Sequence, residues 1–242
     1  MPIFVLSDKL AFPPPHLSTK EGLLAVGGDL SQKRLLIAYR MGIFPWYSKG
    51  DPILWWSPDP RLVLYPKEFH ISRSLKKVIR KGVFNVTMDL AFEQVILACA
   101  KVRRRTGPGT WIMPEMIDAY CNLYTAGYAH SVEAWQEGTL VGGLYGISLG
   151  GSFFGESMFS RVADASKVCL AYLVQYLTVN SFDIIDCQVK SDHLISLGAR
   201  EISRKNFSSQ LQKSLKRKTL IGKWTDDFRI YTENPDQIYF NN

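Results

Sequence analysis

The sequence predicts an α+β fold in which a small N-terminal domain precedes a larger domain with a mixed, mostly antiparallel sheet. Nine of the twelve prolines fall within the first 66 residues, which marks residues 1–62 as a small, irregular unit. Further along, three strand patterns at 130–159 are joined by hairpin turns, and a helix and another strand follow them. We therefore expect the larger domain to occupy residues 63–242.

The N-terminal unit contains a predicted strand at 23–26 and a predicted helix at 31–41 that has a polar cap and a glycine stop. Three tryptophans then lie within eleven residues on a proline-rich frame, at Trp46, Trp55 and Trp56. They form either a plug that closes the domain or a platform on which a flat ligand stacks. We favour the plug for Trp55 and Trp56, and we expect Trp46 to be more open.

The elements of the larger unit follow from apolar periodicity and from turn residues. Glu137-Gly138 and Gly150-Gly151 are good hairpin signals. The predicted order is a strand at 62–65, a helix at 70–81, a strand at 86–88, helices at 91–100 and 113–126, strands at 130–135, 140–147 and 152–159, a helix at 165–179, a strand at 182–189, a short helix at 192–197, and finally a helix and tail.

Composition bounds the class of protein before any motif is considered. Hydrophobic residues make up 46% of the 242 residues, so a folded core is expected. The four cysteines include no CxxC pair and the four histidines show no metal-ligand spacing, so we expect no metal. The start lacks a signal-peptide pattern, and the longest uncharged run, 139–155, carries six glycines and suits a hairpin better than a membrane span. We therefore expect a cytoplasmic protein without membrane association.

The clearest charge feature is the helix at 70–81, which has five basic residues along one face and no acid among them. A solvated helix face normally mixes both signs of charge, so an unmixed stripe favours contact with phosphates. A merely solvated face stays the alternative. The net charge of +7 and the pI near 9.2 agree with a polyanionic partner. The five residues are Arg73, Lys76, Lys77, Arg80 and Lys81.

Polar side chains stand beside large apolar ones in two of the predicted strands. In the first, strict alternation places Glu156 on one face with Phe154 and Met158. In the second, Asp186 and Gln188 share a face at i, i+2. A carboxylate on a buried face is costly unless something binds it, so we interpret these strands as the walls of a ligand pocket. The alternative is that the polar groups satisfy the backbone of nearby loops.

Two nucleophilic mechanisms fit the sequence poorly. The run from Gly155 to Phe159 resembles the nucleophile elbow of serine hydrolases, but Phe159 stands where the second glycine belongs. Cys187 would need a base, and the sequence implies no nearby histidine.

The meander followed by a strand-to-helix turn resembles the N-acetyltransferase (GNAT) superfamily, so we expect an acetyltransferase-like larger domain. Those enzymes hold the pyrophosphate of acyl-coenzyme A on a glycine-containing turn that opens a helix. In this chain Asp164 replaces the first glycine of that turn, and its carboxylate would repel a pyrophosphate. The residues therefore favour acyl transfer from a nucleic acid carrier. A coenzyme A-dependent N-acetyltransferase and a non-enzymatic RNA-binding module are the alternatives.

Seven motifs, in order and with near-constant spacing from about residue 5 to residue 207, resemble the bacterial leucyl/phenylalanyl-tRNA–protein transferases. The resemblance implies transfer of Leu, Phe or less often Met from aminoacyl-tRNA to proteins with an N-terminal Arg or Lys, which creates a destabilising N-terminus for regulated proteolysis. It also implies that no metal or coenzyme takes part, and we expect a monomer. The motifs are GGDL at 27–30, GIFPW at 42–46, WWSPDPR at 55–61, HISRS at 70–74, GTWI at 109–112, GESMFS at 155–160 and IDCQ at 185–188.

The resemblance also implies roles for individual residues. Asp186 and Gln188 match a proposed catalytic pair that engages the α-amine of the acceptor, with Glu156 in the same hydrogen-bond network. Trp46 and Trp111 match aromatics near the 3′-terminal adenosine, and the five basic residues of the helix at 70–81 match the region that carries the tRNA acceptor stem. The pocket for the donor side chain is matched by Phe153, Met158, Leu170 and Ile185, and Leu144 and Gly155 are placed with them.

The implied chemistry needs little from the enzyme beyond positioning, because the donor is an activated ester. The nucleophile is an α-amine with a reference pKa near 8, so a fraction is already neutral at pH 7 and a histidine base is not essential. Asp186 need only orient the amine and receive its proton. Glu156 or the 2′-hydroxyl of the tRNA stay alternatives for that role.

Overall fold

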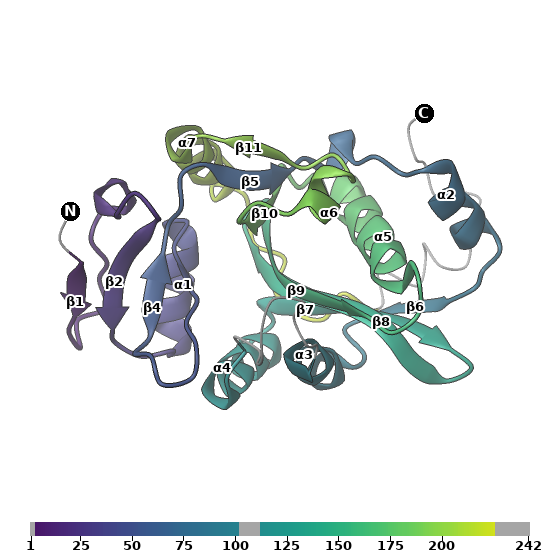
Figure 1. Ribbon diagram of the computed structural model, residues 1–242, viewed down its shortest axis with the longest axis horizontal. Helices are drawn as coiled ribbons and strands as arrows, with labels where there is room; N and C mark the ends of the chain where they lie inside the picture. Colours follow the sequence, from purple (N-terminus) through teal and green to yellow (C-terminus); the bar gives the residue numbers. More distant parts are fainter. Residues whose placement is uncertain (1–2, 102–111, 226–242) are drawn as a thin grey trace.

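The computed structural model describes residues 3–101 and 112–225, and these residues form two sheets. A four-stranded sheet has the order β1-β2-β4-β3, and a seven-stranded sheet has the order β11-β5-β10-β9-β8-β7-β6. The small sheet lies at one end of the molecule, and the large sheet, with helices on both faces, forms the rest (Figure 1). The prediction of an α+β fold with a mixed sheet and a small N-terminal domain is confirmed.

The small sheet is built from short strands and closed by a buried tryptophan. Trp55 is fully buried, packs edge-on against Phe12 with ring centroids 4.8 Å apart, and donates its indole N–H to the Gly27 carbonyl at 2.9 Å. The plug interpretation is therefore confirmed for Trp55, whereas Trp56 and Trp46 are half-buried. The elements are β1 (Phe4–Leu6), a 3-10 turn (Pro15–Leu17), β2 (Leu23–Gly27), α1 (Gln32–Arg40), β3 (Phe44–Pro45) and β4 (Leu54–Trp56).

The large sheet is mixed and mostly antiparallel, as predicted. Only the neighbours β9 and β10 run parallel, and every other neighbouring pair is antiparallel. The short edge strand β11 was not predicted from the sequence, because three residues give too little periodicity. The strands are β5 (Arg61–Leu64), β6 (Asn85–Met88), β7 (Ala129–Gln136), β8 (Thr139–Leu149), β9 (Ser152–Ser160), β10 (Ile184–Gln188) and β11 (Arg200–Ile202).

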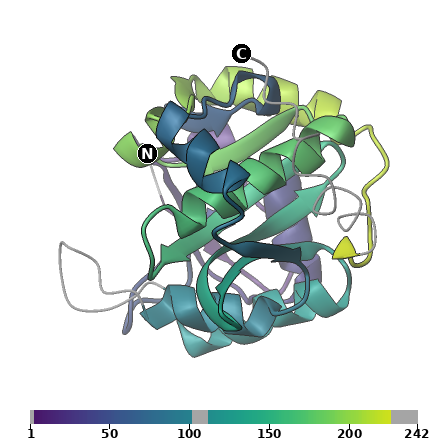
Figure 2. The same ribbon diagram turned by 90° about the vertical axis from the view of Figure 1, so that its right-hand side faces the viewer.

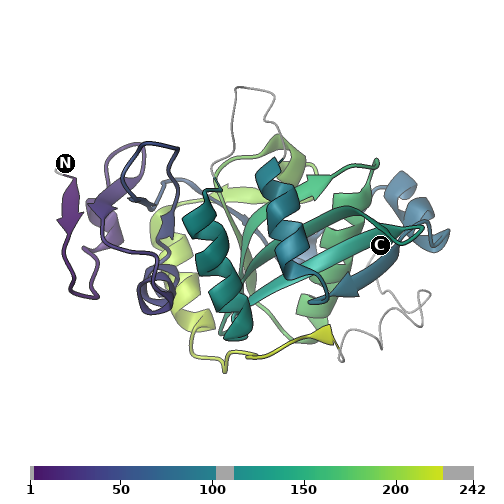
Figure 3. The ribbon, with the colours of Figure 1, turned by 90° about the horizontal axis from the view of Figure 1, so that it is seen from below.

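Helices cover both faces of the large sheet. The long helix α5 packs on one face, and α3 and α4 pack side by side on the other (Figures 1 and 3). No helix in residues 3–101 or 112–225 is long and apolar enough to cross a membrane. The bounds are a 3-10 turn (Pro66–Glu68), α2 (Arg73–Arg80), α3 (Phe92–Lys101), α4 (Pro114–Thr125), α5 (Ala165–Val179), α6 (Asp192–Ile195) and α7 (Arg204–Ser214).

A β-bulge in β9 changes which of its side chains share a face. The pairing of β9 with β8 shifts register so that Glu156 is the extra residue. Beyond it, Met158 packs against the same core cluster as Phe153, under α5, whereas Phe154 belongs to the cluster on the opposite face. The prediction that Phe154 and Met158 share a face is therefore wrong, because the bulge interrupts the alternation.

A second bulge, in β10, separates the two polar residues of that strand. The register of β10 against β5 shifts between Asp186 and Gln188, which makes Cys187 the extra residue, and Gln188 takes a left-handed backbone with φ +58°. Gln188 lines the cavity described below, whereas Asp186 is fully buried against Arg61. The predicted shared face for Asp186 and Gln188 is therefore not present.

Helix α7 holds the N-terminal unit against the large sheet, and the sequence did not predict this role. Gly42 has φ +72°, and a Cβ on it would lie 2.7 Å from the ring of Phe207, so the helix packs directly on its backbone. Gln212 donates to the Arg40 carbonyl at 3.2 Å, and Arg204 donates to the Ser57 carbonyl. This contact fixes the position of β3 above the edge of the large sheet.

Candidate active site

A cavity of about 330 Å³ opens where the parallel strands β9 and β10 separate. Their pairing ends with Phe154 opposite Asp186, and beyond that point β9 pairs only with β8 and β10 only with β5. The two strands therefore line opposite sides of one hollow, with α5 below them. Residues 44–46 of the N-terminal unit and residues 189–194 complete the wall.

The deep part of the cavity is apolar. Leu64, Leu173 and Cys187 line it in addition to the predicted residues. Trp46 lies in the wall contributed by the N-terminal unit, with its ring centroid 5.8 Å from that of Trp56. Trp111 lies outside the described residues. The structure thus brings together every predicted pocket residue, namely Phe153, Met158, Leu170, Ile185, Leu144 and Gly155.

Glu156 is bound by two tyrosines that the sequence did not predict as site residues. Tyr39 from α1 donates to Oε1 at 2.8 Å and Tyr120 from α4 donates to Oε2 at 2.8 Å, while the two hydroxyl oxygens are 2.6 Å apart. These three contacts form a closed ring, and each needs one hydrogen. The two hydroxyls supply two hydrogens, so the third contact is complete only when Glu156 carries a proton.

The surroundings of Glu156 agree with this count. Burial raises the pKa of its carboxyl group to about 7, and the two tyrosine hydrogen bonds lower it only in part. Burial and the Glu156 charge hold the pKa values of Tyr39 and Tyr120 well above their ordinary value, so both tyrosines stay protonated donors. A carboxyl group that titrates near neutral pH can both accept and return a proton.

Asp186 lies behind the cavity wall in a buried ion pair. Arg61 donates from Nε to Oδ1 at 2.8 Å and from Nη2 to Oδ2 at 2.6 Å, and its guanidinium lies between the rings of Phe44 and Phe207. The same Oδ1 accepts the backbone N–H of Gln188 at 3.0 Å. Asp186 therefore stabilises the left-handed conformation of Gln188.

Gln188 connects the Arg61–Asp186 pair to Glu156. Its side chain lines the cavity, and Nε2 lies 3.4 Å from Oε1 of Glu156. The three residues predicted to be catalytic are therefore connected, but they do not all face the cavity. Glu156 and Gln188 line it, whereas Asp186 is buried behind the wall and accepts the backbone N–H of Gln188.

The predicted basic residues lie on α2 and at its C-cap, and none of them lines the cavity. Helix α2 lies at the end of the molecule opposite the small sheet (Figures 1 and 2), and its N-cap is Ser72, whose hydroxyl accepts from the Leu75 amide. Leu75 and Ile79 are buried against the core, which turns the charged residues outward. All five predicted basic residues line one shallow depression on this face: Arg73, Lys76, Lys77, Arg80 and Lys81.

The helix start that resembles a pyrophosphate turn carries an acid in a left-handed conformation. Asp164 has φ +66°, which favours glycine, and its carboxylate pairs with Lys167 at 2.8 Å. A negative charge at the N-terminus of α5 disfavours the binding of a pyrophosphate there. The left-handed backbone at Asp164 is one that glycine favours, and its correspondence to the glycine of a pyrophosphate turn stays a prediction.

An apolar cavity that ends at a carboxyl group with a pKa near neutrality is typical of an enzyme active site. A model of the leucyl/phenylalanyl-tRNA protein transferase family matches residues 63–212, and a model of the N-terminal domain of the same proteins matches residues 28–59. The chain therefore belongs to the leucyl/phenylalanyl-tRNA–protein transferase family, and it is an aminoacyltransferase.

Individual relatives agree with this assignment. The chain is 60% identical over 224 residues to the leucyl/phenylalanyl-tRNA–protein transferase of Desulforapulum autotrophicum, an alignment that spans 93% of this chain and 98% of the relative. It is 60% identical over 215 residues to that of Syntrophobacter fumaroxidans, over 89% of this chain and 92% of the relative. A solved structure of a functionally unknown conserved protein from Staphylococcus epidermidis aligns with a TM-score of 0.39 at 11% identity, over 75% and 68% of the two chains. A likeness this weak carries no argument about fold or function.

Proposed function

We propose that this protein transfers leucine, phenylalanine and, less often, methionine from aminoacyl-tRNA to the α-amine of proteins that begin with arginine or lysine. The new peptide bond gives the acceptor a destabilising N-terminus for regulated proteolysis. The observation that carries the proposal is the apolar cavity that ends at Glu156, whose carboxyl group has a pKa of about 7.

The donor side chain enters the apolar part of the cavity in this proposal. Phe153, Met158 and Leu170 line that part, and they favour leucine, phenylalanine and methionine because a polar side chain would lose its hydrogen bonds to water there. Such a pocket discriminates only modestly between apolar side chains of similar size. The 3′-terminal adenosine lies beside Trp46 in the same arrangement, and Trp111 is proposed for the same contact.

The acceptor amine approaches the ester from the side of Glu156 and Gln188. Its nitrogen forms a bond to the ester carbonyl carbon, and the bond from that carbon to the ribose oxygen of the tRNA breaks. We propose that Glu156 takes the proton that the amine loses and returns it to the ribose oxygen. The closed ring of contacts among Tyr39, Tyr120 and Glu156 supports this role, because a proton on Glu156 completes the third hydrogen bond of that ring.

Asp186 has a positioning role in this proposal. Its charge is balanced by Arg61, and its Oδ1 holds the Gln188 amide, so the carboxamide of Gln188 points into the cavity. Gln188 then orients the amine that reacts. The negative charge left in the cavity is that of Glu156, which favours an acceptor with a cationic first residue.

The remaining assignments have supports of their own. The basic face of α2 is proposed to bind the tRNA acceptor stem, because its depression is lined only by cationic residues. The two family models, which match residues 28–59 and 63–212, support a division into residues 1–62 and 63–242, although β5 of the large sheet already begins at Arg61. The parallel pair β9–β10, whose strands separate at the cavity, supports an acetyltransferase-like larger domain. Four free thiols support a cytoplasmic location, and the monomeric state stays a prediction.

The test is transfer of labelled leucine from Leu-tRNA to a peptide that begins with Arg, beside the same peptide beginning with Ala, without coenzyme A or added metal. We expect transfer to the Arg peptide only. Binding of the tRNA without transfer would favour an RNA-binding module, and transfer of an acetyl group from acetyl-coenzyme A would favour the N-acetyltransferase alternative.

A further inference from the structure

Residues 219–225, called the strap below, follow α7 and lie beyond residues 63–212, which the family model matches. The strap runs along the edge of the molecule and docks on the sheet (yellow in Figure 3). Its backbone and side chains bond to three segments: Gly222 donates to the Gly127 carbonyl at 3.1 Å, and Thr225 donates from Oγ1 to the Met88 carbonyl at 2.9 Å. Thr219 Oγ1 accepts from Gly150 at 2.9 Å. The strap is therefore a fixed part of the fold.

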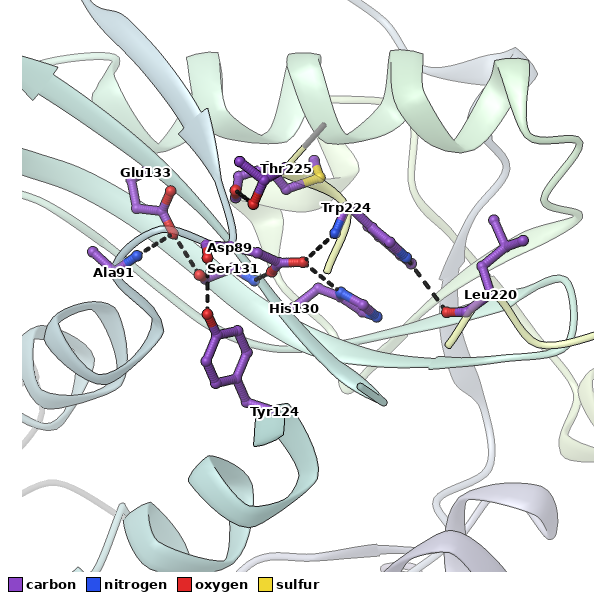
Figure 4. A network of polar contacts seen from close by, with 10 residues as sticks. Asp89, Ala91, Tyr124, His130, Ser131, Glu133, Leu220, Trp224 and Thr225 are labelled. Carbon is purple, nitrogen blue, oxygen red and sulfur yellow. Dashed lines mark hydrogen bonds and ion pairs between the residues drawn. The ribbon is translucent and has the colours of Figure 1, made fainter. Parts of the chain in front are cut away.

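A buried carboxylate holds the strap at Trp224. Asp89 is fully buried, and its Oδ2 accepts the Trp224 backbone N–H at 2.9 Å and contacts His130 Nδ1 at 2.8 Å, while its Oδ1 accepts the Ser131 amide at 2.8 Å (Figure 4). Tyr124 donates to the Asp89 carbonyl at 2.8 Å. Both oxygens of the Asp89 carboxylate are hydrogen-bonded, so the carboxylate has a fixed orientation. The Trp224 backbone, which donates to it, is therefore held in one position.

The indole of Trp224 fills the space behind the donor cavity. It is 2% exposed and stacks on His130 with ring centroids 3.5 Å apart, and on Tyr176 of α5 at 4.7 Å. It also contacts Phe182 edge-on at 6.0 Å and Phe153 at 6.2 Å. Trp224 thus connects a segment near the C-terminus to a residue of the cavity wall.

Phe153 lies between this tryptophan and the cavity. Its ring lines the cavity, and a Cβ on Gly146 would lie 2.5 Å from it, so β8 leaves no spare room on that side. Because Trp224 contacts this ring and does not itself line the cavity, removal of its indole would open volume beside the ring.

We propose that Trp224 is a positioning residue that fixes the ring of Phe153 and thereby sets the depth of the donor cavity. The inference rests on the proposed function, in which that cavity receives the donor side chain. Removal of the indole lets the Phe153 ring withdraw from the cavity, which deepens it. A deeper cavity favours the larger phenylalanine donor over leucine.

The test is competition between Leu-tRNA and Phe-tRNA for one Arg-initiated peptide. The product ratio reports the ratio of the two kcat/KM values and does not depend on how much of the enzyme is folded, so a merely structural role would not move it. For Trp224→Ala we expect a shift toward phenylalanine of about fivefold, in the range expected for a change in the size of an apolar pocket. Trp224→Phe, which retains a ring, is expected to stay close to the wild-type ratio.

Two control variants separate the possible failures. Leu24→Ala truncates a fully buried side chain of the small sheet, and should lower Tm without moving the ratio. Met158→Ala enlarges the cavity directly and should move it. Trp224→Leu replaces the alanine variant if the latter does not fold.

A shift in Met158→Ala but not in the Trp224 variants would overturn the inference and leave the donor cavity in place. No shift in any of these variants would show that the cavity does not receive the donor side chain, which would overturn that part of the proposed function as well. A shift in Leu24→Ala equal to that in Trp224→Ala would also contradict a specific role for Trp224.

Discussion

One carboxyl group, Glu156, lines the cavity and another, Asp186, lies behind its wall, and their partners are of different kinds. Asp186 faces Arg61, a cation that keeps its charge at any relevant pH, and the pair is almost fully buried. Glu156 faces the hydroxyl groups of Tyr39 and Tyr120 and the amide of Gln188, none of which carries a charge. One carboxylate is therefore paired with a cation, whereas burial raises the pKa of the other, Glu156, to about 7.

This difference separates the roles of the two residues. Both oxygens of Asp186 are engaged by Arg61, and one of them also accepts the Gln188 amide, so Asp186 suits positioning. A carboxyl group with a pKa of about 7 suits proton transfer at neutral pH, which is why we propose that task for Glu156. We therefore propose different roles for the two acids, because only Asp186 has a cation paired with it.

The largest expected effect is on transfer in Glu156→Gln. The amide keeps the size and hydrogen-bonding ability of the side chain but cannot take the amine's proton, so we expect the single-turnover rate to fall by about 10²–10⁴-fold. Binding of the tRNA should be unchanged. Glu93→Gln, on the exposed part of α3, is the matched control. A loss of less than tenfold would assign the proton to another acceptor.

The next effect concerns stability. Arg61→Met leaves the charge of Asp186 buried without a partner, and we expect the free energy of unfolding in urea to fall by about 3–5 kcal/mol. The double variant Arg61→Met/Asp186→Leu removes that charge and should regain more than half of the loss. It should nevertheless stay inactive, because the Gln188 amide has lost its acceptor. A double variant that transfers leucine normally would disprove the positioning role of Asp186.

The sequence predicted the apolar half of this site better than the polar half. Phe153, Met158 and Ile185 belong to strands whose apolar character is visible in short runs, and the family motifs include Met158 and Ile185. In the sequence Tyr39 belongs to the apolar stripe of a predicted helix. It donates a hydrogen bond to Glu156, which lies 117 positions further along the chain. No local pattern can predict a partner at that distance along the chain.

The two bulges explain the other errors. Alternation assumes that each strand residue has one partner, and the extra residues Glu156 and Cys187 violate that assumption. A bulge depends on the register imposed by the neighbouring strand, so the isolated sequence of β9 or β10 does not contain it. Arg61 stood inside a recognised motif, but its pairing with Asp186 follows only from the contact between β5 and β10.

A pH profile sharpens the comparison of the two acids. In the wild type the single-turnover rate should rise with pH through about 7, because Glu156 becomes a base only when ionised. Tyr120→Phe removes a hydrogen bond that lowers the pKa of Glu156, so that pKa rises and the midpoint of the profile moves to higher pH. The acceptor amine has the same pKa in both assays, so its titration does not contribute to the difference between the two midpoints. An unchanged or lower midpoint in Tyr120→Phe would contradict the inference that the tyrosine hydroxyls control the pKa of Glu156.

The smallest expected effect is on tRNA binding at the basic face of α2. Neither Glu156 nor Asp186 lies in the depression on that face. Lys77→Ala removes one exposed cation from the depression on that helix, so KM for the aminoacyl-tRNA should rise a few fold while kcat stays constant. If the lysine contacts a phosphate, the slope of log KM against log salt should decrease by about 1. Lys33→Ala, an exposed lysine of α1, should change neither quantity. Equal effects of the two variants would indicate that general charge, and not this face, attracts the tRNA.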